Sequence, residues 1–164
     1  MLEWTPMLWS NACDYAIRAA VHLAEHPDAL VALKDITREE SIPAPYVGKI
    51  LQALVRADIL QSVRGPRGGY ALAHPPEKIT LLMVVGAIDG TKALDGCVVG
   101  LGRCSADVPC PLHDAFAPVR ATIRACLEDT TLASMGGARR AKLARVRKGL
   151  ALRKAPARRP QPRR

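Results

Sequence analysis

"IPAPYVGKILQALVRADILQSVRGPRGGYALA", residues 42–73, is the stretch that decides the fold. Its first half predicts a helix over about residues 45–57, because apolar residues recur there every three or four positions. Pro45 suits the first position of such a helix, whereas the preceding IPAP favours a turn. In the second half, two short strand-like runs flank RGPRGG over residues 59–73. Glycines at such a tip are typical of a β-hairpin.

A second, shorter helix is expected just before this stretch, in ALKDITREES from Ala32 onward. We expect Leu33 and Ile36 to point inward and its charges outward. Two short helices joined by a tight turn form a helix-turn-helix, here over residues 32–57, and the hairpin that follows forms a wing. The sequence therefore predicts a mainly α fold with a small β-hairpin wing, that is, a winged helix-turn-helix.

The polar residues of this unit indicate what it binds. A recognition helix fits the major groove of DNA, and an arginine on a wing can enter the minor groove or bind phosphate. Alternatively, Lys49 is only a solvated helix residue, and the hairpin is a plain surface ribbon. The candidate DNA contacts are Tyr46, Lys49 and Gln52 on the helix and Arg64 and Arg67 at the hairpin tip.

Further helices are expected on both sides. Ser10 can cap a helix over residues 10–26, and Thr80 can cap another that Gly90 closes. A long helix is expected over about residues 111–130, although Pro118 would delay or kink it. Its apolar seam predicts pairing with a second copy, the alternative being packing on its own chain. The seam consists of Leu112, Phe116, Val119, Ile123 and Leu127.

A cysteine-rich segment, CVVGLGRCSADVPCPLH, occupies residues 97–113. Cys97, Cys104 and Cys110 would supply three thiolates, so a metal centre there needs a fourth ligand. His113 is one helical turn beyond Cys110 and is the natural choice from spacing. Asp14 is a competitor, although it could simply pair with Arg18 one turn along its helix.

Three chemistries suit these residues. Iron–sulfur clusters are held mainly by thiolates, with occasional histidine. Three cysteines and a histidine also make a structural zinc site, which a nucleic-acid-binding module could use. A third possibility is a metal-free thiol switch in which a cysteine such as Cys110 is oxidised reversibly. Cys13 and Cys126, without ligand neighbours, are expected to be small buried residues.

Charge is distributed unevenly over the 164 residues, whose formal net charge is +9. Residues 138–164 contain 12 of the 24 lysines and arginines and no acidic residue. We interpret them as a basic disordered tail, either merely solvated or a nonspecific tether to nucleic-acid phosphate.

An apolar run long enough to span a membrane and a signal-peptide pattern are both lacking, so a cytoplasmic protein without membrane association is expected. Motifs for catalysis are lacking too, so an enzyme is not expected.

Taken together, DYAIRAAVHLA at residues 14–24, the stretch at 42–73 and the cysteine triplet resemble a family of bacterial winged-helix regulators. That family includes the iron–sulfur cluster regulator IscR and the nitric-oxide sensor NsrR. The resemblance covers residues 7–137 and leaves residues 1–6 as an N-terminal extension. It implies a homodimer that binds a pseudo-palindromic DNA operator, most simply as a repressor, under the control of an iron–sulfur cluster on the loop 97–113. The signal would be iron–sulfur status, redox stress or nitric oxide.

The resemblance also bears on the fourth ligand. The position of His113 is similar to that of the histidine ligand in IscR, which implies a 2Fe–2S cluster. Asp14 is in a segment similar to that of NsrR, where an aspartate reaches across the dimer to a 4Fe–4S cluster. The first cysteine gap, with six intervening residues, differs from the five associated with IscR, so both alternatives stay open.

Overall fold

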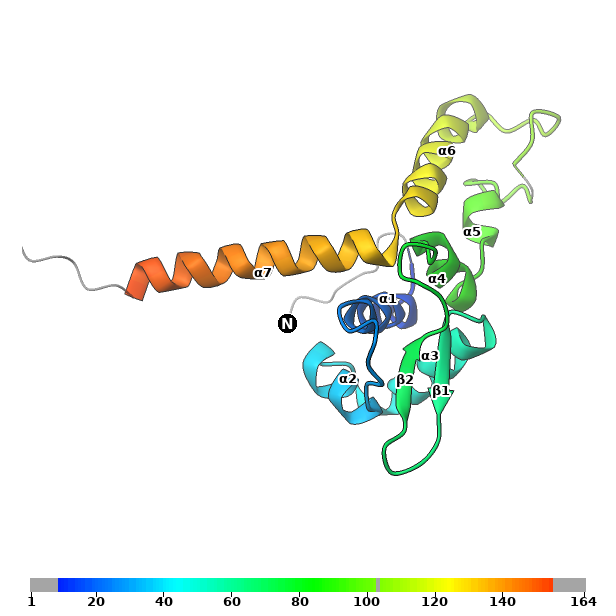
Figure 1. Ribbon diagram of the computed structural model, residues 1–164. Coiled ribbons are helices and arrows are strands. Elements are labelled where there is room, and N and C mark those ends of the chain that lie inside the picture. Colours follow the sequence, from blue (N-terminus) through cyan, green and yellow to red (C-terminus); the bar gives the residue numbers. More distant parts are fainter. Residues whose placement is uncertain (1–8, 103, 155–164) are drawn as a thin grey trace, which may run out of the picture.

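The computed structural model describes residues 9–102 and 104–154, with the predicted extension 1–6 outside them. In chain order the elements are α1 (Asn11–Ala24), α2 (Leu33–Glu40), α3 (Ala44–Arg56), β1 (Leu60–Val63), β2 (Gly69–Leu72), α4 (Leu81–Ile88), α5 (Lys92–Asp95), α6 (His113–Asp129) and α7 (Leu132–Lys154). Figure 1 shows the wing, α2 and α3 at one end of the molecule and α6 at the other. The predicted winged helix-turn-helix is confirmed.

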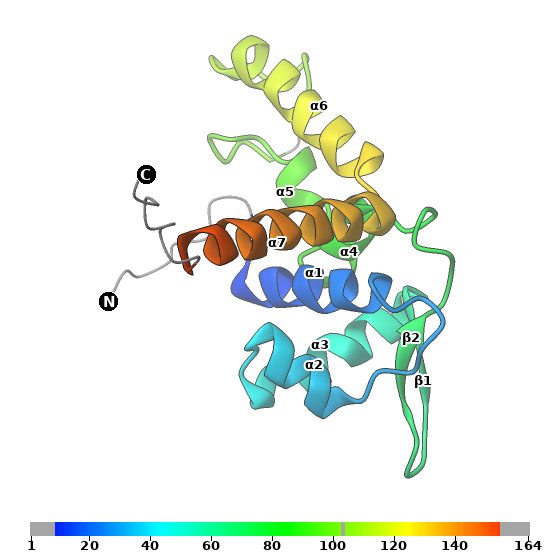
Figure 2. The same cartoon turned by 60° about the vertical axis from the view of Figure 1, so that its left-hand side comes forward.

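Helix α1 is the centre of the core. Its small residues let neighbouring helices approach closely, and its buried face includes Ala16, Ala20 and Leu23. As predicted, Ser10 caps the helix, accepting a hydrogen bond from the Cys13 amide at 3.1 Å. The Ser10 hydroxyl also donates to the Asp89 carboxylate at 2.6 Å, which ties the start of α1 to the end of α4. Figure 2 shows α1 between α7 on one side and α2 and α3 on the other.

The helix-turn-helix forms where the sequence predicts it. Ser41 ends α2 in the left-handed conformation, with φ of 51°, and Pro45 lies in the first turn of α3. Ile36 is fully buried, as expected, but Leu33 is 37% exposed, so the expectation that it points inward is wrong. Leu33 is the first residue of α2, whose buried residues, Ile36 and Glu40, come later in the helix.

The wing is an antiparallel hairpin in which Leu60 pairs with Leu72 and Val63 with Gly69. Tyr70 of β2 exchanges two backbone hydrogen bonds with Val31, each 2.9 Å long. The edge of β2 that does not pair with β1 is therefore also held. At Gly69 an added Cβ would lie 2.6 Å from the Val31 carbonyl oxygen. Glycine at this position is therefore what allows the segment before α2 to approach the hairpin.

The long predicted helix is present as α6, and it continues through Pro118 without ending there. The residue sits in the second turn, where the missing amide costs one hydrogen bond. The predicted apolar seam divides in two. Leu127 is only 4% exposed in the core, whereas Phe116 is 40% and Val119 is 51% exposed. The carboxyl end of α6 therefore packs on its own chain, and its amino end presents apolar residues to solvent.

The prediction of disorder from residue 138 onward is wrong for residues 138–154, which continue α7. Its first turns are docked on α1, so the nucleus that an isolated helix lacks is already formed, and the following Ala, Leu, Arg and Lys residues favour propagation. Residues 155–164 lie outside the described residues. The basic residues within 138–148 are Arg139, Arg140, Lys142, Arg145, Arg147 and Lys148.

A partly buried ionic cluster holds α7 in place. Arg139 donates to the Glu40 carboxylate at 2.7 Å and lies 3.5 Å from that of Glu25. Glu40, at the end of α2, is 5% exposed and also bonds His22 at 3.0 Å. One arginine thus ties α7 to both α1 and the first helix of the helix-turn-helix.

No helix in the described part of the chain is long and apolar enough to cross a membrane.

Candidate metal centre and nucleic-acid interface

The cysteine loop leaves the short helix α5 and turns back on itself before α6. Gly100 and Gly102 adopt φ values of 80° and 83°, which few other residues tolerate. The Cys97 amide donates to the Gly102 carbonyl at 2.7 Å and closes this turn. The Cys104 amide donates to the Asp95 carbonyl at 3.2 Å, so the second cysteine is brought back to α5.

The loop assembles its candidate ligands as two pairs. The Sγ atoms of Cys97 and Cys110 are 3.5 Å apart. Cys104 Sγ is 3.1 Å from Nδ1 of His113, the first residue of α6. All four side chains are partly buried. The four residues singled out in the sequence are therefore brought together pairwise, by a loop that starts at α5 and ends at α6.

The donor set and its spacing suit a centre with two metals. Two ligands of one tetrahedral metal are separated by about 3.8 Å for two sulfurs and about 3.5 Å for sulfur and nitrogen, given bonds of about 2.3 and 2.0 Å. Both pairs are close to these values. Among the described residues, no group of three or more such ligand side chains gathers at one point. The arrangement fits two metals that each take two protein ligands.

The paired thiols differ in acidity. Backbone amides of Leu101 and Val99 face the Cys97 sulfur and lower its pKa. The Leu112 amide acts in the same sense on Cys110, but desolvation and the adjacent Cys97 sulfur outweigh it, so the pKa of Cys110 is raised. Of this pair, Cys97 is therefore the thiol that ionises first.

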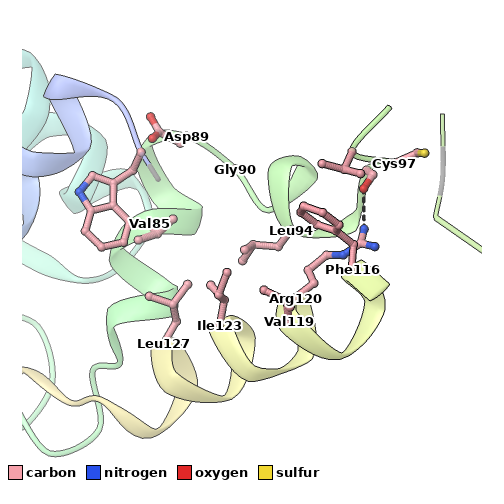
Figure 3. A pocket seen from close by; sticks show the side chains of 13 residues that line it. Val85, Asp89, Gly90, Leu94, Cys97, Phe116, Val119, Arg120, Ile123 and Leu127 are labelled. Atoms are coloured by element: carbon pink, nitrogen blue, oxygen red, sulfur yellow. Dashed lines mark hydrogen bonds between the residues drawn. The ribbon is translucent and has the colours of Figure 1, made fainter. Parts of the chain in front are cut away.

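Two arginines of α6 hold the loop, and the sequence interpretation overlooked both. Arg120 donates to the Cys104 Sγ atom and to the Gly96 carbonyl. Arg124, one turn later, donates to the Asp95 carboxylate at 2.6 Å. Their spacing of four residues was visible in the sequence, but nothing local indicates that this face meets the cysteine loop. Figure 3 shows the Arg120 side chain extending from α6 toward the backbone beside Cys97.

Next to this contact is an apolar cavity of about 510 Å³ between α4, α5 and α6. Figure 3 shows Leu94, Phe116 and Ile123 facing it, whereas the sulfur of Cys97 points away. Four of the five seam residues, Phe116, Val119, Ile123 and Leu127, thus line this partly open cavity, and the Cys97 thiol lies outside it.

The other cysteines and Asp14 lie apart from these pairs. Cys13 is fully buried, and burial, together with the nearby Asp89 and Asp14 carboxylates, raises its pKa to about 12. Cys126 is exposed on α6, so the expectation that it is buried is wrong. Asp14 accepts a hydrogen bond from Arg18 at 3.4 Å within α1, as its plainer interpretation expects.

The five candidate DNA contacts all lie on the outer surface of the helix-turn-helix and the wing. Tyr46, in the first turn of α3, is 54% exposed, and its ring centroid is 6.1 Å from that of Tyr15 on α1. Lys49 and Gln52 follow on the exposed face of α3, and Arg64 and Arg67 are exposed in the turn between β1 and β2. The positively charged groups therefore project from the recognition helix and from the tip of the wing.

Known proteins are similar to this chain in sequence and in fold. The chain is 31% identical over 128 residues to an HTH-type transcriptional regulator of Aquifex aeolicus, covering 77% of this chain and 89% of that protein. It is 31% identical over 122 residues to the regulator IscR of Photobacterium profundum, covering 74% of this chain and 70% of that protein.

Two solved structures have the same architecture. IscR of T. potens aligns with a TM-score of 0.63 and 25% identity, over 82% of this chain and 87% of that one. CymR, described as the global cysteine regulator of B. subtilis, aligns with a TM-score of 0.68 and 21% identity, over 84% of this chain and 98% of that one. At that identity the likeness to CymR concerns the fold alone.

The family model called Rrf2, described as iron-dependent transcriptional regulator, matches residues 9–137, which contain the helix-turn-helix, the wing, the cysteine loop and α6. The relatives matched over most of their length are transcriptional regulators, a class of proteins that bind DNA and are not enzymes. On this match, the chain belongs to the Rrf2 family of winged-helix transcriptional regulators.

Proposed function

We propose that the protein is a homodimeric repressor whose binding to a pseudo-palindromic operator is controlled by an iron–sulfur cluster on the loop 97–113. The observation that carries this proposal is the pairing of Cys97 with Cys110 and of Cys104 with His113, at 3.5 and 3.1 Å. When bound, the cluster would supply iron that responds to oxidants, nitric oxide or the supply of clusters.

The paired layout favours a 2Fe–2S cluster with His113 as the fourth ligand. Such a cluster has two iron atoms, and histidine is an established replacement for cysteine on one of them. The alternative is a 4Fe–4S cluster with Asp14 of a second copy as ligand, which would require Asp14 to leave Arg18. Iron and sulfide analysis of His113→Ala and Asp14→Ala separates the two, since only the variant that lacks the true ligand loses its cluster.

The dimer would form through the amino half of α6. Leu112, Phe116 and Val119 are 39%, 40% and 51% exposed. They form a stripe three to four residues apart, and a second copy of the same stripe is the simplest cover for it. Because the cysteine loop ends at the start of α6, a change at the loop can alter how two recognition helices are spaced. Operator half-sites one helical turn apart, about 34 Å, require that spacing.

The DNA contacts proposed are Tyr46, Lys49 and Gln52 in the major groove and Arg64 and Arg67 from the wing. Their support is exposure on one unit whose fold is that of DNA-binding regulators. Operator sequence and genes follow from selecting bound fragments of genomic DNA.

The test compares operator binding by protein prepared with and without its cluster, both free of oxygen. Spectra and counts of iron and inorganic sulfide define the two forms. We expect a difference of at least fivefold on a full palindrome and little difference on a single half-site, because the cluster acts on spacing. Equal affinity of the two forms on the palindrome would refute control by the cluster.

A metal-free thiol switch is the second candidate, and the separation of Cys97 and Cys110 favours it. At 3.5 Å these sulfurs are close enough for peroxide to convert the two thiols into a disulfide with release of two waters. Colourless protein whose DNA binding responds to peroxide, and loses that response in Cys97→Ser, would support this candidate. Stoichiometric zinc in colourless protein would instead indicate a structural metal site.

A further inference from the structure

We propose that Arg120 is a positioning residue that transmits the state of Cys104 to α6. This inference rests on the proposed function and names the residue through which the cysteine loop would act on the dimer. Arg120 donates through one nitrogen to the Cys104 sulfur and through another to the Gly96 carbonyl. A single rigid guanidinium thus bridges a candidate ligand, the backbone at the start of the loop, and the proposed dimer helix.

The position of Arg120 on α6 makes the contact consequential. It follows directly after Val119, the most exposed residue of the apolar stripe, and it is three residues before Ile123, which packs against the core. Movement of the Arg120 backbone would therefore displace the stripe relative to the rest of the domain. The imidazole of His113, in the first turn of α6, contacts the same Cys104 sulfur. Two residues of α6, His113 and Arg120, therefore hold this thiol to the helix.

Charge explains why the state of Cys104 matters to Arg120. A guanidinium donates strongly to a thiolate, and it donates to a metal-bound sulfur that keeps negative charge. When the metal is lost or the sulfur is oxidised, Cys104 no longer offers that metal-bound sulfur, and it binds the guanidinium less tightly. Weakening that bond leaves Arg120 with the Gly96 carbonyl as its protein acceptor, so α6 and the second half of the loop are no longer tied at this point.

Arg124 provides a matched control. It is on the same helix face, four residues on, and its guanidinium pairs with Asp95 and with Glu128 but not with a thiol among the described contacts. Arg124→Gln removes an arginine that ties α6 to α5. If the cysteine loop acts merely through general attachment to α6, this variant will have the same effect as Arg120→Gln.

The experiment uses full-length protein carrying Arg120→Gln, Arg120→Lys or Arg124→Gln. Three quantities are measured for each: iron and sulfide content, the midpoint potential of the centre, and the ratio of operator affinities with and without the cluster. We expect Arg120→Gln to retain iron and sulfide, to shift the midpoint potential to a more negative value, and to reduce the affinity ratio at least fivefold. The potential falls because a cation and a donor to sulfur are lost. Arg120→Lys should restore part of the potential but little of the ratio, since one ammonium replaces a two-point bridge.

The results discriminate between the two levels of the proposal. The role of Arg120 is overturned if Arg120→Gln keeps its cluster and its ratio of operator affinities is unchanged. It is also overturned if Arg124→Gln reduces that ratio equally, or if both Arg120 variants lose the cluster. Wild-type protein that has no cluster, or binds operator equally well without it, overturns the proposed function instead.

Discussion

Replacing Gly68 with alanine should disable the wing. An added Cβ at residue 68 would lie 2.2 Å from the Val63 carbonyl oxygen and 3.0 Å from the backbone atoms of Arg64 and Gly65. Real Cβ atoms do not approach so closely, and all three neighbours are backbone, so no side-chain rotation relieves the clash. The turn must open where the Gly68 amide donates to the Gly65 carbonyl at 2.9 Å.

Two magnitudes follow. Overpacking that forces the backbone to shift costs about 1–3 kcal/mol, and we expect a loss of that order in the free energy of unfolding. An opened turn also displaces the guanidinium groups of Arg64 and Arg67. One arginine contact with a base or a narrow groove is worth about 1–3 kcal/mol. At about 1.4 kcal/mol for each factor of ten, operator affinity should fall about 5- to 150-fold.

The assay combines urea unfolding with operator titration, and Gly137→Ala is its control. Gly137 is within α7, and an added Cβ there meets nothing within 4 Å. In a helix interior alanine is favoured over glycine by about 1 kcal/mol, so this variant should be more stable and bind operator like the wild type. Gly68→Ala protein that binds operator within twofold of wild type would show that the wing does not contact DNA.

Three further outcomes are expected. Arg64→Ala should weaken operator binding by about 1–3 kcal/mol in a gel-shift titration, and an unchanged affinity would remove Arg64 from the interface. Arg139→Met should lower the free energy of unfolding by about 1–3 kcal/mol in urea, less than for a fully buried pair because Arg139 is one-third exposed and His22 still binds Glu40. Around pH 8, iodoacetamide should modify the metal-free protein at Cys97, whose pKa is lowered, well before Cys13, whose pKa of about 12 keeps it protonated. Mass spectrometry that found Cys13 labelled first would contradict this order.

The elements that the sequence predicts correctly are those with local signals. The helix over about residues 45–57 and the hairpin over 59–73 are marked by their own periodicity, prolines and glycines. Their expected bounds differ from those of α3 and of the β1–β2 hairpin by one residue at each end. Disorder beyond residue 138 was a compositional inference, and it fails because a contact across 99 residues of sequence, from Arg139 to Glu40, helps to dock the helix. Composition does not report such a partner.

For the candidate centre too, local sequence signals predict some residues, whereas others depend on the fold. Three cysteines and a histidine are identifiable from spacing, but which thiol pairs with which ligand depends on how the loop folds back to Asp95 and Gly102. Arg120 and Arg124 belong to the centre only because α6 runs beside α5, which no local pattern indicates.

The placement of the centre restricts how it can act on DNA. Within the described residues, the side chains of Cys97, Cys104, Cys110 and His113 contact one another, backbone amides of the loop, and Arg120 of α6. The recognition helix and the wing have their own support, from α1, Val31 and the core. A change at the loop therefore reaches α6 before it reaches any residue proposed to touch a base. Under the proposed function, control from such a position would act on the arrangement of two otherwise intact DNA-binding units, which is why we expect a palindrome and a half-site to respond differently.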